Sequence, residues 1–163
     1  MKHQLDDIDW KILAELQENG RITNVELATR VSISAPPCLR RVRALEESGI
    51  IEGYFAQLNA KHLGFELMAF AMVSLHSQSE QDLVAFEACC SDWDLVRACY
   101  MLSGEVDFIL HCVAPDLGAF QNFIIQQLTA TPNVAGVKTS LVIRGSKCLP
   151  GVPLAAVYGE GVE

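Results

Sequence analysis

Hydrophobic side chains in the first third of the chain recur every three or four residues. Between residues 5 and 20 they fall on one face of a predicted helix, and Gly20 closes the run. Thr23 and Glu26 follow with the T-x-x-E spacing of a capping box, which predicts the start of a second, shorter helix. The chain therefore begins with two helices separated by a short break.

Two adjacent prolines mark the start of a third helix. Proline is tolerated in the first helical turn, so Pro36 and Pro37 indicate a helix start with Ser34 as its N-cap, and Gly49 suits the position just past its end. Only a few residues join the second and third helices, which predicts a helix-turn-helix. The apolar stretch 50–58 that follows is expected to be extended and to form a strand or hairpin, the wing.

The pattern changes at about residue 65. From there, runs of alternating or continuous apolar residues, which predict strands, alternate with segments that predict helices. The order is βαββαβ, which is the ferredoxin-like unit. We therefore predict an α+β protein with a winged helix-turn-helix domain over 1–60, a second domain over 65–147, and a Gly/Pro-rich tail over 148–163 without a predicted element. The strands are expected at 65–77, 94–102, 108–114 and 134–144, and the helices at 79–90 and 115–130.

The first strand of this unit is apolar on both of its alternating faces. Between Ala69 and Leu75, alanine, valine and leucine occupy one face, and Phe70 and Met72 occupy the other. Two helices can cover only one face of a four-stranded sheet, so the second face needs another layer. A second copy of the chain is the economical choice, which predicts a homodimer. The alternative is a solvent-exposed sheet face that merely happens to be apolar.

Composition limits the function classes. Half of the residues are hydrophobic and 20% are charged, as in a folded protein, and there is no apolar run of membrane-spanning length and no signal-peptide pattern at the N-terminus. None of the six cysteines forms a C-x-x-C pair, which favours reduced thiols in the cytoplasm and no metal or other cofactor. The net charge of −8 argues against unspecific nucleic-acid affinity. Residues 28–44 nevertheless hold four arginines and no acid.

Three stretches carry a resemblance to a known family: LDDIDWKILAELQENGRITNVELATRV, PPCLRRVRALEESGIIEGY and LSGEVDFIL. Together they resemble the Lrp/AsnC family of transcription regulators, from Leu5 to about Pro153. The resemblance implies a winged helix-turn-helix before a βαββαβ effector domain, pairing through the sheets with further assembly, and an amino acid effector. The chain departs from the family pattern at Ser32-Ile33, where glycine is common, at Val106, where an aromatic is common, and at Phe108, where tyrosine is common.

The third helix is the candidate DNA-binding element. A helical wheel places Cys38, Leu39, Val42 and Leu45 on its packed side and Arg40 opposite them, so Arg40 is the candidate for base contact in double-stranded DNA. Arg41, Arg43 and Ser34 are expected at phosphates. The alternative is a solvated face in which Arg43 pairs with glutamates one turn on. The predicted DNA-binding residues are Asn24, Ser34, Pro36, Pro37, Arg40, Arg41 and Arg43.

The turn at 103–107 is the candidate effector site. Gly104 can expose backbone N–H groups, and Asp107 can pair with an ammonium group, so the turn suits a small amino acid; an ordinary hairpin turn is the alternative. The chain shows no nucleophile elbow, phosphate loop or metal spacing, which argues against an enzyme, whereas a DNA-organising protein without an effector stays open. The predicted effector contacts are Ser103, Gly104, Val106, Asp107 and Phe108.

Overall fold

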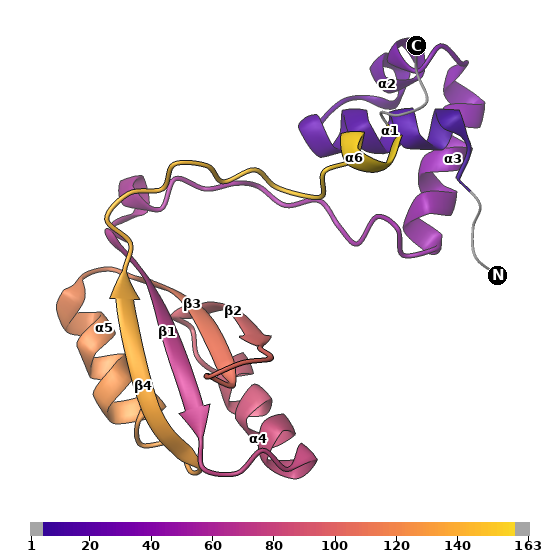
Figure 1. The fold of residues 1–163 in the computed structure, drawn as a ribbon. Helices are drawn as coiled ribbons and strands as arrows, with labels where there is room; N and C mark the ends of the chain where they lie inside the picture. The colour runs from indigo at the N-terminus through magenta and orange to yellow at the C-terminus, as the bar shows by residue number, and fades with distance from the viewer. Residues whose placement is uncertain (1–4, 159–163) are drawn as a thin grey trace. The chain divides into compact units, whose positions relative to one another are not determined.

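The computed structural model describes residues 5–158, which form two compact units (Figure 1). One unit runs to Gln57 and also includes the C-terminal segment from Lys147, and the other spans Leu58–Ser146. The described part of the tail, up to residue 158, therefore belongs to the N-terminal unit.

Three helices build the N-terminal unit: α1 (Asp7–Glu18), α2 (Asn24–Arg30) and α3 (Ala35–Glu47). The predicted start signals act as caps, since Thr23 accepts a hydrogen bond from the amide of Glu26. At α1 the cap is Asp6, which forms a reciprocal capping box with Asp9. The helices close over one apolar cluster, which consists of Ile12, Leu27, Ala28, Val31, Cys38 and Leu45.

The turn of the helix-turn-helix has left-handed backbone at a residue other than glycine. Ser32 has a φ of 59°, and the amide of Ile33 donates to the carbonyl of Ala28 at 2.9 Å. A side chain at such a φ costs energy that glycine would avoid, so this turn is held by the helices on either side. Gly49, with a φ of 74°, ends α3 as predicted.

The segment after α3 differs from the strand or hairpin expected there. Residues 52–59 form neither a helix nor a strand in the structure. Tyr54 anchors the segment instead, because its hydroxyl donates to Glu46 on α3 at 3.0 Å. Burial and the Glu46 carboxylate raise the pKa of Tyr54 to about 12.

The C-terminal segment is attached to α1 by a pair of hydrogen bonds. The side-chain amide of Gln17 donates to the carbonyl of Val152 and accepts from its amide, both at 2.9 Å. The short helix α6 (Ala155–Tyr158) follows, although the sequence pattern predicts no element there. We call residues 147–158 the C-terminal strap.

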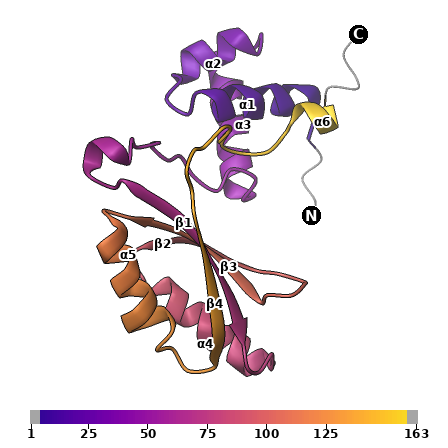
Figure 2. The same ribbon diagram turned by 60° about the vertical axis from the view of Figure 1, so that its left-hand side comes forward.

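The second unit is the predicted βαββαβ sheet (Figure 2). A 3-10 turn, η1 (Lys61–Leu63), precedes the strands, which lie in the order β2-β3-β1-β4 with antiparallel neighbours throughout. This is the strand order of the ferredoxin-like unit. The elements are β1 (Leu67–Leu75), α4 (Glu80–Ser91), β2 (Val96–Met101), β3 (Phe108–Ala114), α5 (Leu117–Phe123), the π turn η2 (Ile124–Leu128) and β4 (Val134–Leu141).

Helices α4 and α5 cover one face of the sheet, and the core lies between them and the inward residues of β1 and β3. The predicted helix at 115–130 is not uniform, because it widens into the π turn. Residues five apart point in different directions on an α-helix, whereas the wider turn brings Leu128 round to the side of Phe123. Both side chains are buried as a result.

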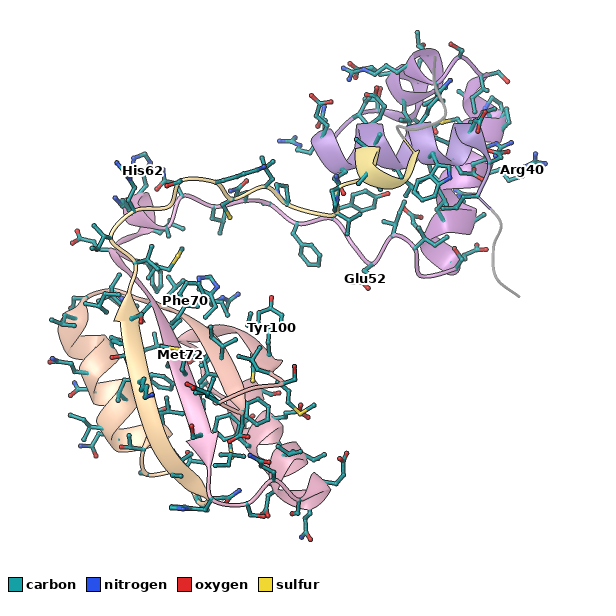
Figure 3. All side chains as sticks on the ribbon, viewed as in Figure 1. Arg40, Glu52, His62, Phe70, Met72 and Tyr100 are labelled. Atoms are coloured by element: carbon teal, nitrogen blue, oxygen red, sulfur yellow. The ribbon has the colours of Figure 1, made fainter. Side chains whose placement is uncertain are left out.

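The opposite face of the sheet has no covering layer within the described chain. Cross-strand rows place Tyr100, Ile109 and Met72 side by side, followed by His111 beside Phe70 (Figure 3). The rings of Phe70 and His111 lie 5.4 Å apart. These residues are only partly buried or exposed, so the two-sided apolar pattern of β1 corresponds to a real unpartnered surface. We call it the outer sheet face.

Candidate DNA-binding face and effector turn

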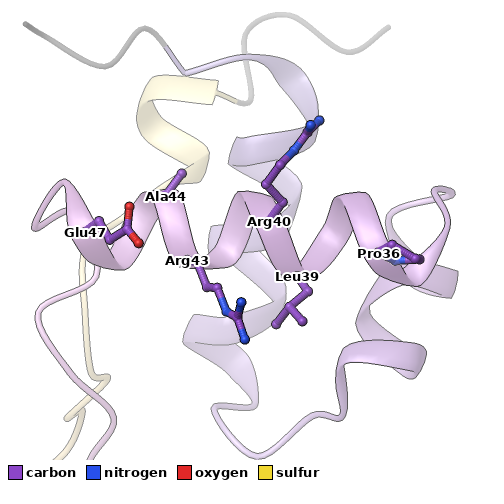
Figure 4. Close-up of a pocket in the computed structure, with 6 residues that line it drawn as sticks. All are labelled: Pro36, Leu39, Arg40, Arg43, Ala44 and Glu47. Atoms are coloured by element: carbon purple, nitrogen blue, oxygen red, sulfur yellow. The ribbon is translucent and has the colours of Figure 1, made fainter.

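One stripe of α3 faces away from the core of the N-terminal unit. It begins in the first turn, where the prolines lie, and recurs at intervals of three and four residues, as one helix face requires. A shallow hollow runs along it (Figure 4). The hollow is lined by Pro36, Leu39, Arg40, Arg43, Ala44 and Glu47.

Arg40 and Arg43 are the available cations of this stripe. Both are exposed, and the described part of the chain gives neither of them an ion pair or a side-chain hydrogen bond. The glutamate pairing considered for Arg43 is therefore not formed, and Glu46 instead accepts the hydroxyl of Tyr54. Two unpaired guanidinium groups on an outward helix face suit a polyanion with hydrogen-bonding base edges.

Arg41 forms ion pairs within the N-terminal unit. Its guanidinium contacts Asp9 at 2.7 Å and Asp6 at 2.8 Å, which ties α3 to the start of α1. The Asp9 and Asp6 carboxylates raise the pKa of Arg41 above its ordinary value. An arginine already paired with two carboxylates is less available to a phosphate, and we call Arg41, Asp6 and Asp9 the Arg41 clamp. Arg30 is likewise paired, with Glu15 at 2.8 Å.

Asn24 and Ser34 lie where the two helices of the motif meet. The Asn24 side chain donates to the carbonyl of Ala35 at 2.8 Å, which fixes the start of α2 against the start of α3. The side-chain oxygen of Asn24 is buried and has no hydrogen-bond partner among residues 5–158. The hydrogen bond to Ala35 helps to position α3. Ser34 is the N-cap of α3 but its hydroxyl makes no capping bond, so it is free to donate to a phosphate.

Leu39 is the residue that the helical wheel misplaced. The wheel put it on the packed side, but 39% of its surface is exposed and it lines the outward hollow beside Arg40. The core of the unit is completed without it by Cys38 and Leu45, which are fully buried. A wheel gives only the direction of each residue around the helix axis, so a leucine at the edge of the packed side is easily assigned to the core.

The turn at 103–107 is held tightly from its C-terminal side. Asp107 accepts from the amide of Leu75 and from the side-chain amide of Gln78, both at 2.7 Å, and its own amide donates to Val73 at 2.9 Å. The carboxylate therefore joins the turn to the end of β1 and to the loop that follows it. Ser103 and Gly104 are exposed, and nothing lies within 4 Å of the position where a Cβ would stand on Gly104.

Phe108 does not line an open site at this turn. It is fully buried, and its ring lies 4.7 Å from that of Phe86 on α4, inside the core. Val106 is half-buried and stays beside the turn. The structure thus brings Ser103, Gly104 and Asp107 together at the surface, with Gln78 as a neighbour that the sequence did not suggest.

Comparisons with known proteins agree with this architecture. Residues 5–52 match the model for a winged helix-turn-helix DNA-binding domain, and residues 68–152 match that for the Lrp/AsnC ligand binding domain. The chain belongs to the Lrp/AsnC family. Because the Lrp/AsnC family consists of transcription regulators, the protein is a DNA-binding regulator with a domain for amino acid effectors, and not an enzyme.

Individual Lrp/AsnC relatives are similar along nearly their whole length. A leucine-responsive regulatory protein of Rhizobium meliloti (strain 1021) is 61% identical over 88% of this chain and 92% of its own. The Bkd operon transcriptional regulator of Pseudomonas aeruginosa is 39% identical over 93% and 99%. The structure of the transcriptional regulator NMB0573 from Neisseria meningitidis, in complex with L-Met, superimposes with a TM-score of 0.89 at 38% identity and covers 94% of this chain and 99% of that one. No helix within residues 5–158 has the length and apolarity to cross a membrane.

Proposed function

We propose that this regulator binds operator DNA by laying the outward stripe of α3 in the major groove. The observation that supports it is the pair of unpaired guanidinium groups, Arg40 and Arg43, on the second helix of a helix-turn-helix. Arg40 contacts a base edge, Arg43 contacts a phosphate, and Ser34 donates to a phosphate at the helix start. Arg41 has no part in the contact.

Binding to a duplex selected from random sequences tests this assignment. Arg40→Ala weakens binding by about 1–3 kcal/mol and relaxes the preference at one base step. Arg43→Ala weakens selected and unrelated DNA alike and reduces the dependence on salt. Two alanine variants that bind the selected duplex as the parent does would refute the proposed face.

The effector of this protein is an amino acid with an apolar or sulfur-containing side chain, bound at residues 103–107. Two relatives support this choice, because one is a leucine-responsive protein and another is solved with L-Met. Asp107 meets the ammonium group, since each oxygen of a carboxylate can accept a further hydrogen bond beyond those from Leu75 and Gln78. Gly104 and Ser103 leave backbone N–H groups for the carboxylate.

Titration calorimetry with L-leucine and L-methionine tests the site through Asp107→Asn. Asparagine keeps an oxygen for the amide of Leu75, so the turn survives, but the negative charge is lost and binding weakens tenfold or more. Gln78→Ala is the matched control, because it removes a neighbour of Asp107 without removing the charge, and it retains binding. No heat with any of the twenty amino acids would favour the other candidate, a protein of this fold that organises DNA without an effector.

The working form is a homodimer that assembles through the outer sheet face and can associate further. The support is the partly exposed apolar surface around Phe70 and Met72. Met72→Glu is expected to give monomers in sedimentation, whereas Val84→Glu, on the exposed side of α4, leaves the assembly intact. A Met72→Glu variant that sediments as the parent does would exclude this face. We also propose a cytoplasmic location, which DNA binding and the six free cysteines support.

A further inference from the structure

Leu39 is a large, exposed apolar side chain in a stripe that also carries Arg40 and Arg43. It shares the hollow with Arg40, the next residue, and with Arg43, one turn further on (Figure 4). Single exposed hydrophobic residues are common on protein surfaces and need no reason by themselves. This one stands out because it lines the same hollow as two guanidinium groups that have no partner in the described chain.

The fold gives Leu39 no evident structural task. The apolar cluster of the N-terminal unit contains Cys38, and Val42 packs against it, but Leu39 is neither within that cluster nor among the residues packed against it. More than a third of its surface is exposed, whereas a leucine that completes a core is buried. Replacing it with alanine or glutamine, which are good helix formers, should therefore leave the fold intact.

We propose that Leu39 recognises thymine in the operator through the methyl group on C5. Thymine alone presents a methyl group in the major groove, and an apolar side chain is the group that distinguishes it from the other bases. Leu39 and Arg40 are adjacent in sequence and both line the hollow, so the thymine lies next to the base pair that Arg40 contacts. This inference rests on the proposed function, in which the outward stripe of α3 enters the major groove.

Uracil in place of thymine isolates the contact, because the two bases differ only by that methyl group. The probe is the duplex selected from random sequences by the full-length parent, with each thymine replaced by uracil in turn. Burying one methyl group corresponds to about a fourfold change in affinity. We expect one thymine in each half-site to show this loss with the parent, measured by fluorescence anisotropy.

Three variants assign the effect to the side chain. Leu39→Ala and Leu39→Gln bind the thymine and uracil duplexes equally, with Leu39→Gln as a second, polar replacement of similar length. Arg40→Ala binds both duplexes more weakly but keeps the fourfold difference, because its own contact is with another base. Thermal unfolding of each variant confirms that it is folded.

The outcomes separate this inference from the function on which it rests. If the parent selects a duplex but loses no affinity at any uracil, or if Leu39→Ala keeps the thymine preference, Leu39 does not recognise the methyl group and the DNA-binding face stands. If the parent selects no duplex at all, the proposed DNA-binding face itself is wrong, and the role of Leu39 with it.

Discussion

Removing the guanidinium of the Arg41 clamp should destabilise the N-terminal unit. Arg41→Met keeps an apolar stem but leaves the Asp9 carboxylate, 5% exposed, without its cation. Breaking a buried pair costs about 3–5 kcal/mol, and an exposed pair is worth about 0–1 kcal/mol. Arg41 is 29% exposed and Asp6 52%, so the clamp falls between these limits, and we expect a loss of about 2 kcal/mol.

Tryptophan fluorescence can report on this unit alone. The chain has two tryptophans, Trp10 on α1 and Trp93 in the other unit, so a Trp93→Phe background leaves Trp10 as the probe of urea unfolding. Arg40→Ala is the matched control on the same helix, expected within about 0.5 kcal/mol of the parent because its side chain is unpaired. If Arg41→Met unfolds at the same urea concentration as Arg40→Ala, the clamp does not stabilise the unit.

The clamp also predicts a dependence on pH. The amide of Asp9 and then the Arg41 guanidinium lower the pKa of Asp6 below its ordinary value of 3.8. A carboxyl group with a lowered pKa stabilises the fold above its unfolded value and loses that contribution as it becomes protonated. The difference in stability between parent and Asp6→Asn should therefore be present above pH 3.8 and shrink as the pH falls below it.

Further predictions concern the turn, the segment after α3 and the C-terminal strap. Ser32→Gly should raise the stability of the N-terminal unit by about 0.5–1 kcal/mol in urea unfolding, because a left-handed φ suits glycine; an unchanged or lower midpoint would contradict this. Tyr54 should ionise near pH 12, seen as the absorbance difference between parent and Tyr54→Phe, and its stabilising effect should be lost as the pH rises from 10 toward 12. Gln17→Ala should speed hydrogen exchange at the amide of Val152, and equal rates would show that this bond does not hold the strap.

Local signals in the sequence determined the elements and their order. Caps such as Thr23 act between residues three apart, and glycine ends a helix through its own backbone, so both are visible in a short stretch. The two-sided apolar pattern of β1 likewise predicted the outer sheet face. Side chains of a strand point alternately to the two faces of the sheet, so apolar residues at successive positions give both faces apolar side chains. The order βαββαβ, once found, leaves few ways to arrange four strands.

Only the tertiary structure decided which side chains of the candidate sites are available. Arg41 and Arg40 are neighbours of the same chemical type, but Asp9, 32 residues before Arg41, neutralises one and leaves the other free. Asp107 is likewise engaged by the amide of Leu75, 32 residues earlier, and Phe108 is buried beneath α4. Charge pairing and burial depend on groups that come into contact only on folding. A sequence pattern can therefore identify a candidate site residue, but it does not show whether other residues of the protein already pair with that side chain or bury it.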